Sequence, residues 1–222
     1  MLDIVYGLDL MDSMSQVLAT KGFATWNIEY RRLSDPGSGY PGTFQDVGAA
    51  IDKLRDLEPI YKLDLKRVVT VGHSAGGHLG VWASARPKLP LAEPTRGVNP
   101  LPIRAAISLA GVLDLEESLD LDVCSDTAAK LVGGLPADLP ARYALVSPKR
   151  LLPIGVPQVL IHGTADTLVP FVMSEHYVQA AKAAGEPSIL LVPIEGGDHF
   201  AVIDPKTAMW SAVETAIIAA IP

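Results

Sequence analysis

The chain has 222 residues, of which 49% are hydrophobic, and this suits one α/β domain over residues 1–222 with a sizeable core. Its 18 Lys and Arg against 25 Asp and Glu give a formal net charge of −7, and the absence of a long basic run argues against nucleic acid as a partner. A single cysteine, Cys124, excludes an intrachain disulfide and favours a reducing, cytoplasmic location.

Several other classes of protein are disfavoured by what the sequence lacks. The N-terminus has no basic start followed by a long apolar stretch, so we expect no signal peptide. No apolar run reaches about 18 residues, so we expect no membrane span. Neither a His-Glu-x-x-His run nor paired cysteines occur, so we expect no zinc site, and no organic cofactor is implied.

Strand and helix patterns alternate along the chain, which is typical of a mostly parallel sheet covered by helices. The first half predicts a helix over 10–20, a strand over 23–30, a Gly/Pro-rich loop over 34–42, a helix over 46–57, a strand over 67–71 and a helix through 78–85. The second half predicts an irregular excursion over 86–102, strands over 103–109, 156–162 and 188–193, and helices over 174–184 and 205–220. Segment 111–150 has no clean strand, and we expect a small lid-like or edge excursion there.

Ser74 is the candidate nucleophile, because it lies in the run Gly72-His73-Ser74-Ala75-Gly76 between a predicted strand and a predicted helix. In that setting a Gly-x-Ser-x-Gly motif turns sharply and lifts the serine above the sheet. The following helix directs its first amides at the reacting carbonyl. The motif alone is common, and its alternative role is a tight turn with a capping serine.

A serine hydroxyl needs a base and an orienting acid. We predict His199 as the base and Asp166 as the acid, each in a loop after a predicted strand, where open α/β sheets build their sites. The chain order Ser, Asp, His is that of α/β-hydrolases. Asp198 and Asp114 are weaker alternatives for the acid.

The remaining histidines have ordinary structural explanations. His73 is a candidate for shaping the substrate pocket, together with Tyr40 in the loop 34–43, although packing at the turn is its simpler role. We expect His78 to be structural, His162 to satisfy a buried hydrogen bond, and His176 to lie on a helix surface.

Motifs over nearly the whole chain resemble the α/β-hydrolase superfamily, in the esterase and prolyl-oligopeptidase-like branch that includes kynurenine formamidase relatives. The matching stretches are residues 22–32, 44–47, 72–79, 147–148, 162–166 with 169–170, and 197–200. The resemblance implies Ser74, Asp166 and His199 as the triad. It also implies the Ala75 amide as an oxyanion donor.

One family motif is missing. The His-Gly-Gly stretch that supplies the second oxyanion donor does not occur, and the resemblance begins near Leu2. The chain therefore resembles a family member truncated at its N-terminus, without the first strands of the usual fold. Three outcomes are open: residues 3–6 form a replacement strand with Gly7 near the oxyanion, the strands on either side of the gap pair with each other, or the chain is a shortened, weakly active product.

The sequence predicts a serine hydrolase that cleaves small carboxylic esters, with a small-molecule ester as its partner and neither nucleic acid nor membrane. An amide hydrolase, such as a formamidase or small peptidase, is the alternative reaction. The alternative to an active enzyme is a truncated hydrolase fold with weak catalytic activity.

Overall fold

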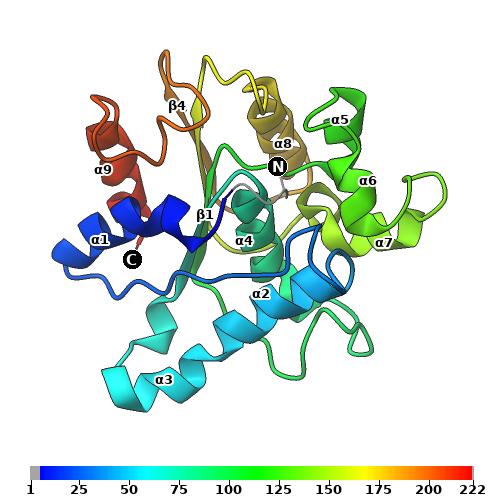
Figure 1. The fold of residues 1–222 in the computed structure, drawn as a ribbon, viewed down its shortest axis with the longest axis horizontal. Helices are drawn as coiled ribbons and strands as arrows, with labels where there is room; N and C mark the ends of the chain where they lie inside the picture. Colours follow the sequence, from blue (N-terminus) through cyan, green and yellow to red (C-terminus); the bar gives the residue numbers. More distant parts are fainter. Residues whose placement is uncertain (1–5, 222) are drawn as a thin grey trace.

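Four parallel strands lie side by side in the order β1-β2-β3-β4 within residues 6–221, the part of the chain that the computed structural model describes (Figure 1). They are β1 (Val69–His73), β2 (Ala105–Leu109), β3 (Gln158–Gly163) and β4 (Ile189–Ile194). All three pairings are parallel, so the carboxyl ends of the strands share one edge. The predicted α/β class with a mostly parallel sheet is confirmed.

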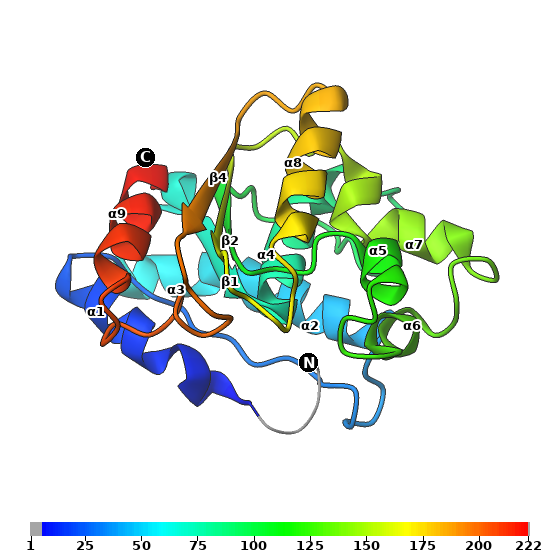
Figure 2. The same ribbon diagram turned by 90° about the horizontal axis from the view of Figure 1, so that it is seen from above.

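Helices follow the strands and cover both faces of the sheet. They are α1 (Asp12–Thr20), α2 (Gly42–Asp52), α3 (Leu54–Tyr61), α4 (Ala75–Ala85), α5 (Leu115–Asp120), α6 (Thr127–Val132), α7 (Pro140–Val146), α8 (Val172–Ala183) and α9 (Trp210–Ala220). Figure 2 shows α1 and α9 on one side of the strands and α2, α4 and α8 on the other. No helix within residues 6–221 is both long and apolar enough to cross a membrane.

The strands alternate their side chains between these two layers, as a pleated backbone requires. Ile107 and Ile161 pack in the cluster that contains Met14 of α1 and Ile217 of α9. Leu160 points to the other face and packs in the cluster around α4 and α8. Strands β2 and β3 are buried throughout, which explains their nearly continuous apolar sequences.

The predicted strand over 23–30 is wrong. No residue from 23 to 32 is assigned to a strand, although the sequence of residues 23–30 is largely apolar. Phe23 packs with the α1 and α9 cluster, whereas Ile28 and Tyr30 pack with the α2 and α4 cluster, so the segment crosses from one layer to the other. A strand requires hydrogen bonds to a neighbouring backbone, and within residues 6–221 none joins this segment to β1.

The pairing of β1 excludes one of the three outcomes expected from the missing His-Gly-Gly stretch. Within the described residues β1 pairs only with β2, so the neighbouring segments do not pair with each other across the gap. The expected replacement strand falls mostly on residues 3–5, which lie outside the described residues. Tyr6 and Gly7 are described, and they are not in a strand.

Several element boundaries also differ from those predicted. The helix expected over 46–57 is two helices, α2 and α3, and α2 begins earlier, at Gly42. The closing helix begins at Trp210 rather than near 205, because residues 201–209 form successive turns in the loop that carries His199. Segment 111–150 contains α5, α6 and α7 and no strand, as expected.

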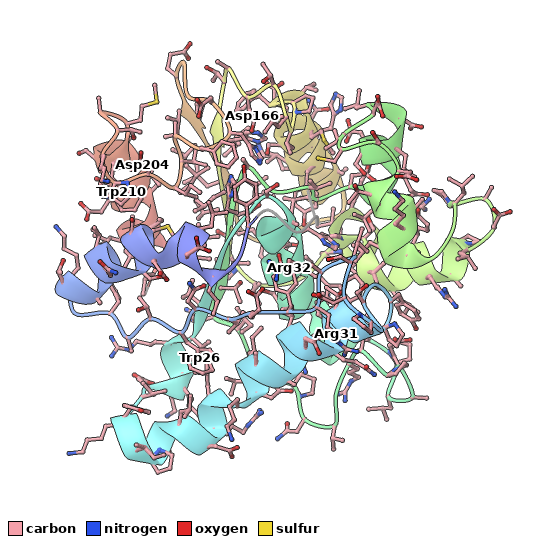
Figure 3. All side chains as sticks on the ribbon, viewed as in Figure 1. Trp26, Arg31, Arg32, Asp166, Asp204 and Trp210 are labelled. Carbon is pink, nitrogen blue, oxygen red and sulfur yellow. The ribbon has the colours of Figure 1, made fainter. Side chains whose placement is uncertain are left out.

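A buried ion pair fixes α2 against α4, the helix that follows Ser74. The Arg86 side chain, just after α4, is only 1% exposed, and its Nη2 lies 2.6 Å from Asp52 Oδ2 at the end of α2. The same guanidinium donates to the carbonyls of Gly48 and Arg96. Figure 3 shows Arg31, whose Nε donates to Asp46 Oδ2 at 2.7 Å and ties the preceding segment to α2.

We predict that Asp52→Asn lowers the free energy of unfolding by about 3 kcal/mol, because it leaves the buried Arg86 cation without its counter-charge. Urea unfolding followed by circular dichroism measures the change. Asp56→Asn is the matched control, since Asp56 is 70% exposed and pairs only at the surface with Lys53. Equal losses in the two variants would contradict the proposed importance of the buried pair.

Candidate active site

Ser74 occupies a sharp turn between β1 and α4. Its φ of 54° and ψ of −118° are strained for a residue with a side chain, and such strain is concentrated at functional sites. The turn is held at both ends, because Ser74 N–H donates to the Leu109 carbonyl at 2.9 Å and the Ser74 carbonyl accepts from His78 N–H at 3.1 Å. The predicted position of the serine between a strand and a helix is therefore confirmed.

The glycines of the turn are not equally constrained. A Cβ on Gly72 would lie 2.1 Å from the Gly76 carbonyl oxygen, so only glycine fits there. A Cβ on Gly76 would meet nothing within 4 Å. The crowded position is instead Gly77, where a Cβ would lie 2.8 Å from Gly111 Cα. The turn therefore requires glycine at Gly72 and at Gly77, but not at Gly76, the second glycine of the motif.

Asp166 and His199 meet at the carboxyl edge of the sheet. His199 Nδ1 lies 2.6 Å from Asp166 Oδ2, and both side chains are at most 5% exposed. Their loops follow β3 and β4, which are neighbouring strands. The loops touch so closely that a Cβ on Gly163 would lie 2.2 Å from the Gly197 carbonyl oxygen. Figure 3 labels Asp166 beside α8.

A second histidine, for which the sequence predicts only a structural role, also binds Asp166. His162 is fully buried, and its Nε2 lies 3.1 Å from Asp166 Oδ2 and 2.9 Å from the Val169 carbonyl. Both partners accept, so Nε2 donates, and Nδ1 accepts from the Ser174 hydroxyl at 2.7 Å. The spacing of His162 four residues before Asp166, at the end of a strand, is the signal that could have indicated this contact.

These contacts keep Asp166 ionised. Burial alone would raise the pKa of Asp166, but hydrogen bonds from His162, His199 and the Val169 amide outweigh it and hold the pKa well below its usual range. The other carboxylate oxygen accepts from Leu168 N–H at 2.8 Å and Val169 N–H at 2.9 Å. An anionic Asp166 accepts from His199 Nδ1–H, so in a neutral His199 ring the unprotonated nitrogen is Nε2, the atom that can act as a base.

His73, the residue before Ser74 in the sequence, contacts this pair. The structure shows no hydrogen bond between Ser74 and His199 in residues 6–221, but His73 Nε2 lies 2.8 Å from the His199 carbonyl. The rings of His73 and His199 are 4.5 Å apart. Catalytic hydrogen bonds are often long before substrate binds. Ala75 is the first residue of α4, where an amide has no partner within the helix.

The alternative acids are occupied elsewhere. Asp198 is exposed, and its Oδ1 accepts from the amides of Phe200 and Ala201, which stabilises the turn after His199. Asp114 caps α5 and lies 2.5 Å from Lys149 Nζ. Among the described aspartates, Asp166 is therefore the one whose carboxylate contacts His199.

The other sequence candidates lie as follows. Tyr40 donates its hydroxyl to Glu93 Oε1 at 2.9 Å, and Arg142 lies over its ring, so the structure does not bring Tyr40 into contact with Asp166 or His199. His78 is buried and bonds to the Val146 carbonyl, and His176 is exposed on α8. Tyr6 packs its ring 5.8 Å from Phe200, the residue after His199, and Gly7 follows it.

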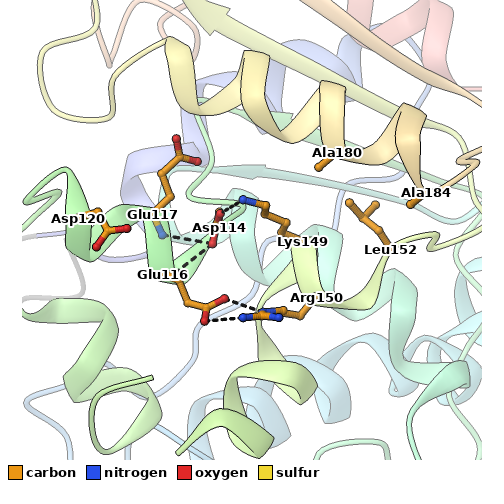
Figure 4. Close-up of a pocket in the computed structure, with 9 residues that line it drawn as sticks. All are labelled: Asp114, Glu116, Glu117, Asp120, Lys149, Arg150, Leu152, Ala180 and Ala184. Carbon is orange, nitrogen blue, oxygen red and sulfur yellow. Dashed lines mark hydrogen bonds and ion pairs between the residues drawn. The ribbon is translucent and has the colours of Figure 1, made fainter. Parts of the chain in front are cut away.

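Two cavities lie beside α5. The smaller, of about 30 Å³, is lined by the start of α4, the loop after β2, and α5 and α6. Its lining includes Ala75, His78, Val112, Val123 and Leu131. The larger, of about 620 Å³, lies between α5 and α8 and is lined by none of Ser74, Asp166 and His199. Figure 4 shows that its two basic side chains pair with lining carboxylates, Lys149 with Asp114 and Arg150 with Glu116.

Comparisons with known proteins agree with the fold. The BD-FAE family model matches residues 6–180. Among solved structures, a thermophilic esterase of Thermogutta terrifontis with propionate bound is 28% identical, with a TM-score of 0.65, and the match covers 86% of this chain and 67% of that one. A comparison with curated proteins found no match.

Other similar structures include a bifunctional GH43-CE protein of Bacteroides eggerthii, 25% identical, with a TM-score of 0.74. That match covers 95% of this chain but only 29% of the other. A carboxylesterase of Lactobacillus plantarum is 21% identical, with a TM-score of 0.66 over 86% of this chain and 70% of that one, and it supports the fold alone.

The buried histidines predict how stability depends on pH. Burial lowers the pKa of His73 and of His78 to about 4, so both are neutral in the folded protein. In the unfolded chain they bind protons near pH 6.5, so the unfolded state binds more protons between these values. The free energy of unfolding should therefore fall as the pH drops from about 6.5 toward 4.

Urea unfolding over this pH range measures the slope, and His78→Gln should make it shallower by removing one titrating group. Asp166 acts in the same direction at lower pH, because its stabilisation is present above the unfolded pKa and is lost as the pH falls through the folded pKa. A stability that is constant over the histidine range would contradict the neutral, buried histidines.

Proposed function

The chain belongs to the BD-FAE family and has the α/β-hydrolase fold, and from this premise we propose that it is a serine hydrolase that cleaves small carboxylic esters. The observation that carries the proposal is the contact of His199 Nδ1 with Asp166 Oδ2 at 2.6 Å, beside the strained turn that holds Ser74. The esterase neighbours favour ester cleavage over amide cleavage.

In the proposed reaction Ser74 Oγ attacks the ester carbonyl while His199 Nε2 takes its proton. The Asp166 anion holds the ring so that Nδ1 carries a proton throughout, and it stabilises the imidazolium that forms. The tetrahedral intermediate then collapses, the C–O bond to the alcohol breaks, and His199 returns the proton to the leaving alkoxide. A water molecule then attacks the acyl carbonyl while His199 Nε2 takes its proton, the bond from the acyl carbon to Ser74 Oγ breaks, and His199 returns the proton to Ser74.

The oxyanion of the intermediate would be bound by the Ala75 amide, the first of α4. A helix N-terminus favours negative charge there. One donor is weaker than a complete oxyanion hole, and removing one donor from such a hole costs roughly 10²–10³ in turnover. We therefore expect modest turnover if Ala75 acts alone.

We propose that the small cavity next to Ala75 receives the acyl group. Its walls are largely apolar, with Val112, Val123 and Leu131 among them. A volume of about 30 Å³ holds only one or two small groups, so short acyl chains should fit best. The alcohol would leave through the open side, where the loop 34–43 remains our candidate for contacts, Tyr40 included.

We predict that Ser74→Ala and His199→Ala reduce hydrolysis of p-nitrophenyl acetate to the uncatalysed background, and that Asp166→Asn lowers kcat by about 10⁴-fold. Steady-state kinetics and labelling by a fluorophosphonate probe measure these effects. Ser13→Ala, on the exposed face of α1, is the matched control. If wild type and Ser74→Ala share one rate, the chain is a catalytically weak hydrolase fold; a probe adduct on another residue would refute Ser74 as the nucleophile.

We further predict that the wild-type protein prefers p-nitrophenyl acetate to the hexanoate ester. Leu131→Ala should raise kcat/KM for hexanoate relative to acetate by about tenfold, because it lengthens the cavity by more than one methylene. Leu135→Ala is the control, since Leu135 lies on the same segment but is 53% exposed. An unchanged acyl-chain preference in Leu131→Ala would show that the acyl group binds elsewhere.

A further inference from the structure

The base and the nucleophile stand on elements that are not neighbours. Ser74 follows β1, whereas His199 follows β4, and β2 and β3 lie between those strands. The separation between Ser74 and His199 therefore depends on how the loop after β4 is held across the sheet edge.

Three hydrogen bonds of that loop lead back to the loop after β3. Ala165 N–H donates to the Gly197 carbonyl at 2.9 Å, and Gly196 N–H donates to the Thr164 hydroxyl at 2.8 Å. His199 itself bonds to Asp166. These contacts place His199 relative to Asp166, but they do not place it relative to Ser74.

Within residues 6–221, the hydrogen bond that connects this loop to the nucleophile strand comes from His73. Its Nε2 lies 2.8 Å from the His199 carbonyl oxygen, and because a carbonyl only accepts, Nε2 donates. The His73 ring also packs 5.7 Å from the Phe200 ring. His73 is the last residue of β1 and the direct neighbour of Ser74.

We infer that His73 is a positioning residue, which sets the distance between Ser74 and His199 through its hydrogen bond to the His199 backbone. This inference rests on the proposed function of Ser74 and His199. It gives His73 the role of holding His199, the proposed base, rather than a role in the substrate pocket.

The chemistry of the two imidazoles fits this division of roles. His73 is 7% exposed, and burial, followed by the nearby His199, lowers the pKa of His73 to about 4. His73 therefore remains a neutral donor at neutral pH and does not compete with His199 for the serine proton. His199 differs because its Nδ1 lies 2.6 Å from Asp166 Oδ2, which leaves Nε2 to accept the serine proton.

The experiment compares His73→Leu, which fills the space without a donor, with His73→Gln, whose side-chain amide restores one. We expect His73→Leu to lower kcat for p-nitrophenyl acetate by about 100-fold, since a displacement of about 1 Å at a reacting group has that effect, with KM changed less than about twofold. His73→Gln should recover most of the lost kcat. His176→Gln on the exposed face of α8 is the control.

A second measurement does not depend on turnover. The rate at which the fluorophosphonate probe labels Ser74 should fall in His73→Leu and recover in His73→Gln, because labelling also needs His199 near Ser74. The His199 Nδ1 proton, hydrogen-bonded to Asp166, should keep its downfield proton NMR resonance in all three proteins, since the loop after β3 holds that bond. Wild-type kcat in His73→Leu, equal damage in the Leu and Gln variants, or loss of the resonance in His73→Leu would overturn the inference. Absence of turnover and of probe labelling in the wild type would instead refute the proposed function.

Discussion

The hydrogen bond between His199 Nδ1 and Asp166 Oδ2 is the interaction on which the candidate site depends. It joins the loops after β3 and β4, and it fixes which nitrogen of His199 carries the proton. The bond requires a very close approach of the two loops, and Gly163 permits this because any side chain there would collide with the Gly197 carbonyl. A contact between backbones thus determines the chemistry of a side chain.

Asp166 also shows how a buried carboxylate can remain charged. Two histidines and two backbone amides direct donors at its oxygens, and together they offset the unfavourable burial. His162 contributes without reaching the open side of the site, and Ser174 in α8 holds His162 in turn. Helix α8 therefore supports Asp166, at the carboxyl edge of the sheet, through Ser174 and His162.

The two edges of the sheet behave differently from its centre. Strands β2 and β3 are fully buried, whereas β1 is partly exposed and pairs only with β2 in the described part of the chain. Ser74 is nevertheless placed firmly, since its amide bonds to the Leu109 carbonyl at the end of β2. The nucleophile turn thus takes its support from the side of the sheet that is paired, and His73 extends that support to His199.

The sequence by itself determined the α/β class, most of the helices and strands, and the three residues proposed for catalysis, because local patterns carry that information. Apolar runs predict buried strands, and Gly72 and Gly76 mark the turn at Ser74, although the structure places the second steric need for glycine at Gly77 rather than Gly76. Segment 23–30 shows the limit, since its apolar pattern is that of a strand but a strand also needs a partner. Only the tertiary structure decided that this segment crosses between layers, that His162 shares Asp166 with His199, and that His73 reaches the His199 carbonyl. These are contacts between residues distant in sequence or on different elements, and their geometry is set by how the strands and loops pack rather than by any local pattern.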